Sequence, residues 1–376
     1  MSNQSRIRLE RVTKRWDATA AVDDISFDVT PGQFVILLGP SGCGKSTTLR
    51  MIAGLEEASG GHIYIGERDV TCLPPGDRGL SMVFQSYALF PHLSVADNIV
   101  FGLRSRKVPK AEQRERLAKV AELVDLTDYL TRKPAQLSGG QRQRVALARS
   151  IISEHPICLM DEPLSNLDAR LRSDMRREIK ALQSRLNMTV IYVTHDQVEA
   201  MSMGDRVILM QHGKIVQDGT PDELYNRPAS AFAASFIGSP AMNLLPLVAG
   251  ETGAVIENEP STPVAPMEAA GGHLGVRPED IELRPAASPG VPAKVVSEEY
   301  LGADTIAYVE VGSHTLRARI SGKPLLSGQP CSLYWASKNI HLFDANGLRR
   351  DDMPLSDFAP PIRSIPRPPA MGSFQH

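Results

Sequence analysis

The sequence predicts an α/β domain with a mostly parallel sheet, followed by a small all-β domain. Residues 1–235 alternate short apolar runs with helical patterns, and strands separated by helices are typical of a parallel sheet covered on its faces. After about Phe236 the apolar runs become shorter, and glycine and proline punctuate them as in small β-barrels. We therefore expect a first domain over residues 1–235 and an OB-like β domain over residues 236–346. Residues 347–376 are rich in proline and poor in apolar anchors, which predicts a disordered tail.

Each expected element depends on a local pattern. In the first domain, apolar runs predict buried strands at residues 34–38, 81–84, 157–160, 190–193 and 207–210. Between the third and fourth of these, apolar residues recur every three or four positions, which predicts an amphipathic helix with one face made of Leu171, Met175, Ile179, Leu182 and Leu186. In the second domain, turn-bounded runs predict strands at residues 275–276, 291–297, 305–311, 315–320 and 331–335. Residues 259–272 are rich in proline, alanine and glycine, which predicts a surface loop.

Composition and charge favour a globular protein without a polyanion-binding surface. A hydrophobic content of 42% and a charged content of 22% are ordinary for such a protein. The formal net charge of −2 argues against a broad nucleic-acid surface. The basic residues between Arg104 and Arg116 are interrupted by Glu112 and Glu115, so a solvated helix face is the favoured interpretation there. We therefore expect no nucleic-acid partner.

The sequence also indicates how the chain associates with a membrane and in which redox environment it works. No apolar stretch approaches the ~18 residues that a membrane-spanning helix needs. Residues 1–10 lack the apolar core of a signal peptide, so we expect membrane association to come through partner proteins. The cysteines are scattered and form no CxxC pair, which predicts neither a zinc site nor a disulfide framework and fits a reducing cytosol.

Residues 39–47, which we call the phosphate loop, carry the first chemical motif. Their sequence GPSGCGKST is a GxxxxGK[ST] pattern that follows an apolar strand and precedes a helical pattern, as the motif requires. Glycines let the backbone N–H groups point at phosphate oxygens, and the following helix adds its positive N-terminal end. Lys45 supplies a cation for the β and γ phosphates, and the Ser46 hydroxyl is placed to ligate Mg²⁺. The expected ATP and Mg²⁺ site comprises Gly39, Pro40, Ser41, Gly42, Cys43, Gly44, Lys45, Ser46 and Thr47.

Two adjacent acids form the second motif. Four apolar residues at 157–160 lead into Asp161 and Glu162, which places both carboxylates at the end of a buried strand beside the phosphate loop. We expect Asp161 to hold Mg²⁺, directly or through water, and Glu162 to polarise the attacking water. Two acids in a solvated turn are the alternative. These two motifs together predict a P-loop nucleotide hydrolase.

The pentapeptide LSGGQ at residues 137–141 makes the prediction more specific. It resembles the signature sequence of ABC ATPases at every position. Physically it is a second glycine-rich turn opening onto a helix, hence a second potential phosphate-binding helix end. In that family the signature of one subunit covers the ATP held by the phosphate loop of another. The resemblance therefore implies a second copy of the chain as a partner and a cofactor-binding role for Ser138, Gly139, Gly140 and Gln141. An ordinary helix N-cap is the alternative for Ser138.

Further ABC landmarks occur in the family's order. Gln85 matches the glutamine that meets Mg²⁺ and the attacking water and that begins the loop facing the transmembrane subunits. Asp168, in Ser165-Asn-Leu-Asp168, matches the loop that crosses the dimer interface. His195 matches the histidine that contacts the γ-phosphate. Trp16 lies where related importers place an aromatic residue that stacks on adenine, and packing of Trp16 against a sheet is the alternative.

The resemblance covers residues 6–344 and indicates the carbohydrate-uptake branch of the family. Residues 236–245 (FIGSPAMNLL), 275–281 (GVRPEDI), 301–304 (LGAD) and 341–344 (HLFD) are similar to the regulatory domain of the maltose importer's ATPase and its relatives. The branch implies two transmembrane permease subunits, a periplasmic solute-binding protein and a peripheral position at the cytoplasmic face of a bacterial inner membrane. Within the branch, the combination is most similar to ATPases of glycerol-3-phosphate importers, although those for maltose, trehalose and other sugars share these segments.

Two other classes of ABC protein are alternatives. A soluble ABC protein acting on nucleic acid usually has two ATPase units or a long coiled coil, whereas this chain has one phosphate loop, one signature and no sustained heptads. An exporter ATPase often lacks a C-terminal β domain of this kind. The transported molecule is expected to touch the other subunits, so residues here do not define it.

Overall fold

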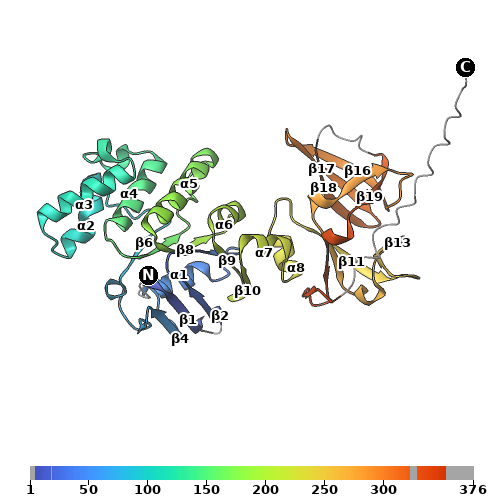
Figure 1. Ribbon diagram of the computed structural model, residues 1–376, viewed down its shortest axis with the longest axis horizontal. Helices are drawn as coiled ribbons and strands as arrows, with labels where there is room; N and C mark the ends of the chain where they lie inside the picture. The colour runs from blue at the N-terminus through green and yellow to red at the C-terminus, as the bar shows by residue number, and fades with distance from the viewer. Residues whose placement is uncertain (1–4, 18, 322–327, 353–376) are drawn as a thin grey trace, which may run out of the picture. The chain divides into compact units, whose positions relative to one another are not determined.

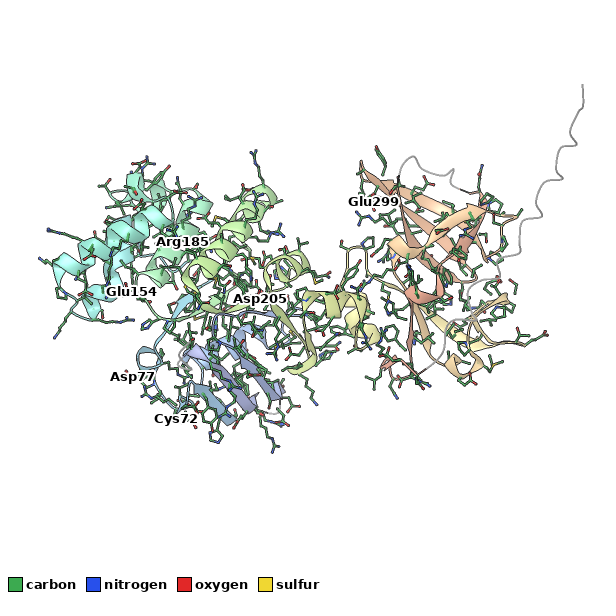
Figure 2. All side chains as sticks on the ribbon, viewed as in Figure 1. Cys72, Asp77, Glu154, Arg185, Asp205 and Glu299 are labelled. Carbon is green, nitrogen blue, oxygen red and sulfur yellow. The ribbon has the colours of Figure 1, made fainter. Side chains whose placement is uncertain are left out.

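The computed structural model describes residues 5–17, 19–321 and 328–352, and the chain falls into two compact units, Met1–Asn226 and Arg227–His376 (Figure 1). The division follows Asn226, so residues 227–235, which we expected in the first domain, belong to the second unit. In the described part of the chain, no helix is both long and apolar enough to cross a bilayer. All four cysteines are free, with Cys72 at the surface (Figure 2).

Unit 1 is built around a six-stranded sheet in the order β10-β9-β3-β8-β7-β6. The five predicted strands are confirmed as β3 (Phe34–Leu38), β6 (Leu80–Val83), β7 (Ile157–Asp161), β8 (Thr189–Thr194) and β9 (Arg206–Gln211). These five pair in parallel, and β10 (Lys214–Gly219) adds an antiparallel edge. Strands β3, β7 and β8 are buried along their whole length, which explains why apolar residues occupy most of their positions.

A second, antiparallel sheet that the sequence did not predict has the order β2-β1-β4-β5. Its strands are β1 (Ile7–Trp16), β2 (Thr19–Val29), β4 (Gly60–Ile65) and β5 (Arg68–Asp69). Helix α1 (Lys45–Ala53) contacts β7 and β8 of the first sheet and β2 of the second. The two sheets and α1 therefore share one apolar core, which includes Leu9, Phe27, Leu37, Leu49 and Ile191.

Helices make up the rest of unit 1. A helical region comprises α2 (Val95–Ser105), α3 (Lys110–Leu123) and α4 (Gly139–Ile151), in which α4 packs on α2 and reaches β6 (Figure 1). Helices α5 (Ala169–Leu186), α6 (Gln197–Met203) and α7 (Pro221–Asn226) follow, with short 3₁₀ turns at Pro75–Asp77, Thr127–Tyr129 and Pro134–Gln136. The predicted amphipathic helix is confirmed as α5: Met175, Ile179 and Leu182 are buried, whereas Leu186 is exposed.

Unit 2 begins with α8 (Ala231–Phe236) and contains two sheets around one core that includes the fully buried Trp335. One sheet has the order β13-β12-β11-β14-β20-β21, formed by β11 (Asn243–Ala249), β12 (Ala254–Ile256), β13 (Glu259–Ala265), β14 (His273–Val276), β20 (Ile340–Phe343) and β21 (Arg349–Arg350). The other has the order β15-β19-β16-β17-β18, formed by β15 (Glu282–Pro285), β16 (Val291–Tyr300), β17 (Asp304–Val311), β18 (His314–Ser321) and β19 (Pro330–Tyr334). Short 3₁₀ turns lie at Met267–Ala269, Pro278–Asp280 and Ser337–Asn339.

Two expectations about unit 2 were wrong. Residues 259–272 are not a surface loop, because β13 occupies the first half and buries Val264 and Ala265. Its prolines are tolerated because β13 lies at the edge of its sheet. The ordered chain also continues beyond residue 347, since β21 pairs antiparallel with β20. The remainder of the expected tail, 353–376, lies outside the described residues.

Candidate nucleotide site

The topology of unit 1 brings four of the sequence motifs to one edge of the central sheet. Strands β3, β8, β7 and β6 are neighbours and run parallel, so their carboxyl ends lie together. The phosphate loop follows β3, His195 follows β8, the two acids end β7, and Gln85 follows β6. Ligands of open α/β sheets bind at this kind of edge.

The phosphate loop is held in a shape that requires glycine at two positions. Gly39 and Gly44 have φ values of 153° and 105°, in the region that other residues rarely adopt. A Cβ on Gly39 would lie 2.3 Å from the Met210 carbonyl oxygen, and one on Gly44 would lie 2.5 Å from that of Ala21. The loop is therefore packed tightly against the backbone of other strands, and it feeds directly into the N-terminus of α1.

Lys45 and Ser46 of this loop have definite hydrogen-bond partners, and Cys43 is buried. The Lys45 ammonium group donates to the carbonyl oxygens of Gly39 and Pro40, both at 2.8 Å, so the side chain folds back over the loop. The Ser46 hydroxyl donates to Oδ1 of Asp161 at 2.7 Å, and Asp161 is 6% exposed. Cys43 is buried, and burial raises the pKa of its thiol, which agrees with a small packing residue and not a nucleophile.

The three predicted catalytic residues meet at one carboxylate. Oε2 of Glu162 accepts from the side-chain amide of Gln85 at 3.3 Å, and Oε1 lies 3.2 Å from Nδ1 of His195. Glu162 has a φ of 43°, an uncommon conformation for a residue with a side chain, and its N–H donates to the Val193 carbonyl at 3.1 Å. Such strain is found mainly at functional sites. The backbone therefore fixes Glu162 between β7 and β8, close to the phosphate loop.

The signature turn (residues 138–141) and Asp168 lie in a different part of unit 1. Ser138 caps α4 by accepting from the Gln141 N–H at 3.3 Å, and Oε1 of Gln141 accepts from the Ser138 N–H at 2.9 Å. Asp168 caps α5 through the Leu171 N–H at 3.0 Å. A Cβ on Gly140 would lie 3.0 Å from Leu171, so the two turns pack closely together. No hydrogen bond between described residues joins them to the phosphate loop of the same chain.

Trp16 ends β1 with 49% of its surface exposed, so its ring is accessible. Nζ of Lys14 lies 5.4 Å from the centre of the Trp16 ring. Lys14 is itself held by the Glu56 carboxylate at 2.5 Å and by the Glu57 carbonyl at 2.8 Å. The sequence did not predict the position of Lys14, because its contacts are with residues more than forty positions away.

Two further residues close to Gln85 were also missed. The Ser165 hydroxyl lies 3.3 Å from the Gln85 side-chain amide, and the Asn166 side-chain amide donates to the Gln85 carbonyl at 3.0 Å. Both belong to the segment at residues 165–168, which was predicted to cross the dimer interface but was given no role at Gln85. The position of this segment soon after Asp161 and Glu162 was the feature of the sequence that could have indicated a contact with Gln85.

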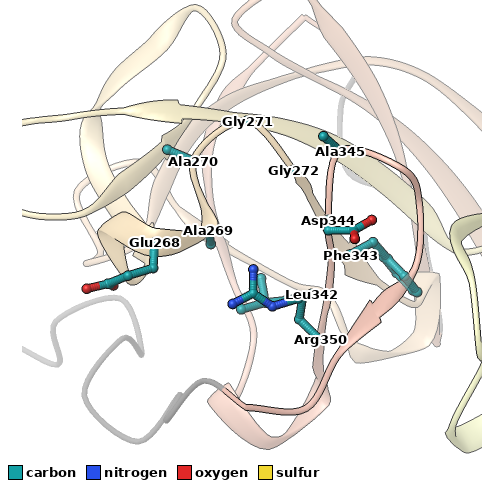
Figure 3. A pocket seen from close by; sticks show the side chains of 10 residues that line it. All are labelled: Glu268, Ala269, Ala270, Gly271, Gly272, Leu342, Phe343, Asp344, Ala345 and Arg350. Atoms are coloured by element: carbon teal, nitrogen blue, oxygen red, sulfur yellow. The ribbon is translucent and has the colours of Figure 1, made fainter.

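Unit 2 has a small cavity of about 100 Å³ (Figure 3). Among the described residues that line it, Arg350 is the one cationic group, and it is already paired with Asp352 at 2.8 Å. The cavity offers no arrangement of catalytic groups; it is lined by Glu268, Ala269, Ala270, Gly271, Gly272, Leu342, Phe343, Asp344, Ala345 and Arg350.

The geometry of unit 1 is that of a P-loop nucleotide hydrolase, and comparisons with known proteins identify the family. The ABC transporter family matches residues 22–165, and the TOBE domain family matches residues 274–343. The chain is 47% identical over 352 residues to the sn-glycerol-3-phosphate import ATP-binding protein UgpC of Yersinia pseudotuberculosis, covering 91% of this chain and 98% of the relative. It is 48% identical over 361 residues to the trehalose/maltose import ATP-binding protein MalK of Thermococcus litoralis, covering 90% and 97%.

A solved structure agrees for unit 1. The dimeric ATP-binding cassette MJ0796, bound to ADP and phosphate, is 30% identical, with a TM-score of 0.51, and the match covers 57% of this chain and 98% of that one. The chain therefore belongs to the ABC importer ATP-binding proteins, ATPases whose hydrolysis is coupled to import. The predicted α/β ATPase fold and the OB-like C-terminal domain are confirmed.

Proposed function

We propose that two copies of this chain bind two ATP molecules between them. Each ATP is held by Lys45, Ser46 and Asp161 of one copy and by Ser138 and Gly140 of the other. The observation that supports this most is the difference in hydrogen bonding between the two glycine-rich turns. The phosphate loop carries Lys45 folded over its carbonyl groups and Ser46 bonded to Asp161, whereas the signature turn has the hydrogen bonds of a helix cap. Solved relatives of unit 1 are dimeric.

Mg²⁺ fits the oxygen atoms beside the phosphate loop. The Ser46 hydroxyl and the Asp161 carboxylate lie 2.7 Å apart, and oxygen ligands of this kind are what Mg²⁺ prefers. Gln85 is the third proposed ligand, through its side-chain oxygen. When bound, the ion neutralises charge on the phosphates.

In the proposed hydrolysis, Glu162 polarises the attacking water. The carboxylate is fixed by the Gln85 amide on one oxygen, and His195 lies beside the other. His195 is more exposed than Glu162, with 56% against 20% of the side chain accessible, which leaves the imidazole able to reach a γ-phosphate. Trp16 is proposed to stack on the adenine ring.

The Glu162→Gln variant tests the role of Glu162. We expect ATP turnover to fall by about 10²–10⁴-fold, the usual contribution of general-base catalysis, while ATP binding persists. Size-exclusion chromatography with ATP and Mg²⁺ should show accumulation of the dimer. Glu122→Gln, at an exposed helix position, serves as the control and should behave as wild type. Wild-type turnover in Glu162→Gln would contradict the assignment.

The import partners are proposed to be two transmembrane permeases and a periplasmic solute-binding protein, with this chain peripheral at the cytoplasmic face of a bacterial inner membrane. Apolar surface at the end of the loop that follows Gln85 supports the permease contact. Phe101 is 42% exposed, and its ring lies 4.3 Å from that of Phe90, which belongs to the same loop as Gln85. Exposed aromatic residues such as Phe101 are typical of protein interfaces.

The proposed substrate is sn-glycerol-3-phosphate, because several relatives similar over nine-tenths of the chain import it. Maltose or trehalose is the second candidate, since a relative of that specificity is equally similar. ATPase activity of the assembled transporter, measured with each solute and its binding protein, decides between them. Stimulation by maltose or trehalose and not by glycerol-3-phosphate would overturn the first choice.

Unit 2 is proposed to regulate the ATPase and to extend the dimer contact. Its apolar core is separate from that of unit 1. The match to the TOBE domain covers the whole of the sheet β15-β19-β16-β17-β18.

A further inference from the structure

The loop that follows Gln85 contains two consecutive residues in a strained backbone conformation. Tyr87 and Ala88 have φ values of 63° and 45°, although neither is a glycine. A left-handed conformation costs a residue with a side chain roughly 1–2 kcal/mol. Consecutive residues of this kind persist only where surrounding groups hold them in place.

Arg149, on the signature helix α4, holds both strained residues. One guanidinium nitrogen donates to the Ala88 carbonyl at 2.6 Å, and the other donates to the Tyr87 carbonyl at 2.7 Å. The planar guanidinium group suits this paired contact, and a lysine ammonium group does not reproduce its fork of donors. Arg149 therefore fixes the direction of two successive peptide groups.

Other side chains fix the two ends of the same loop. Asn166 donates to the Gln85 carbonyl at 3.0 Å. Asn98, on α2, accepts from the Phe90 N–H at 2.8 Å and donates to the Phe90 carbonyl at 3.1 Å. The loop is thus held at three points: by Asn166 at its beginning, by Asn98 of α2 at its end, and by Arg149 of α4 at its strained centre.

We propose that Arg149 is a positioning residue that couples the signature turn to the loop at residues 85–90. Arg149 lies on the same helix as Ser138, about 16 Å away along the axis at 1.5 Å per residue. A helix of this length moves as one body, so displacement of its N-terminal end on binding the partner's ATP displaces the carbonyl groups of Tyr87 and Ala88. The proposal rests on the proposed function, in which Ser138 binds the partner's nucleotide and the loop faces the permeases.

The test is amide hydrogen exchange on the full chain in the Glu162→Gln background, with and without ATP and Mg²⁺. We expect ATP to change exchange in two peptides, one covering the signature turn and one covering residues 87–93. Adding Arg149→Met should leave the change at the signature turn and abolish the one at residues 87–93. Adding Arg149→Lys should give an intermediate result, and this variant carries the test if Arg149→Met does not fold.

Arg116→Met is the matched control. Arg116 is also a half-buried arginine of the helical region, but it pairs with Glu112 and Glu154 and not with the loop. It should leave both changes intact. An ATP-dependent change at residues 87–93 that survives both Arg149 substitutions would overturn the coupling role. Absence of any change at the signature turn in Glu162→Gln alone would instead contradict the two-copy ATP site.

Discussion

The phosphate loop and the signature turn are both glycine-rich turns that open onto a helix, yet the chain equips them differently. At the phosphate loop, the Lys45 ammonium group donates to the Gly39 carbonyl, and the Ser46 hydroxyl donates to the Asp161 carboxylate. Around the signature turn, the contacts are those of an ordinary capping box between Ser138 and Gln141. One turn is a nearly complete site, and the other offers only backbone groups and a helix end.

The glycines of the two turns also differ in how strictly the structure requires them. Position 44 requires glycine because its φ is positive and because a Cβ there would clash with the Ala21 carbonyl. Gly140 is constrained only by the side chain of Leu171, which can move. The phosphate loop is therefore fixed against backbone atoms of neighbouring strands, whereas Gly140 of the signature turn packs against the Leu171 side chain.

The largest expected difference between the turns concerns ATP binding by a single chain. Lys45→Ala removes a charge-assisted contact to phosphate, and such contacts contribute about 1.5–3 kcal/mol each, so the Kd for ATP should rise about 10- to 100-fold. Ser138→Ala should leave the Kd of the monomer unchanged, because in the proposed dimer its turn contacts the nucleotide held by the other copy. Isothermal titration calorimetry at concentrations below dimerisation measures both. An equal loss of affinity in the two variants would remove the distinction.

A smaller difference is expected in stability. Gly44→Ala should destabilise unit 1 by about 2 kcal/mol or more, since the left-handed backbone costs roughly 1–2 kcal/mol before any clash. Gly140→Ala should cost about 1 kcal/mol or less, because Leu171 can yield. Thermal unfolding of both variants gives the ranking. The reverse order would show that the signature turn is the more rigid of the two.

The smallest expected effect is that of Trp16. Trp16→Ala should weaken ATP binding by about 1 kcal/mol, at the low end of measured base stacking, whereas Trp16→Phe should retain most of the affinity. Comparing ATP with inorganic triphosphate in the same titration separates stacking from phosphate binding. A similar loss for both ligands would indicate that Trp16 supports the fold instead of the base.

Much of the site was predictable from the sequence because buried parallel strands are continuously apolar and their carboxyl ends carry the motifs. Strands 34–38, 157–160 and 190–193 are neighbours in one parallel sheet, so Ser46 meets Asp161 and Glu162 meets His195 at their carboxyl ends. The antiparallel sheet of unit 1 was not predicted, because β1 has register shifts around Arg11 that interrupt the alternation of buried and exposed residues. Strand β13 was missed because its prolines are typical of loops.

Contacts that depend on strained backbone had no signal in the sequence. Nothing in the residue types of Tyr87 and Ala88 indicates positive φ, so their contact with Arg149 could not be anticipated. The same holds for Glu162, whose conformation is fixed by Val193 from a neighbouring strand. Local propensity fails at such positions because distant contacts determine the backbone.

The most direct test of the two-copy ATP site is a mixing experiment with two inactive variants. Lys45→Ala destroys the phosphate loop and Ser138→Arg destroys the signature turn, so homodimers of either variant should hydrolyse ATP hardly at all. A mixed dimer has one site that joins the intact Lys45 of one copy to the intact Ser138 of the other. ATPase activity of the mixture well above the sum of the separate variants is the predicted result. Activity no greater than that sum would contradict the sharing of one ATP between two copies.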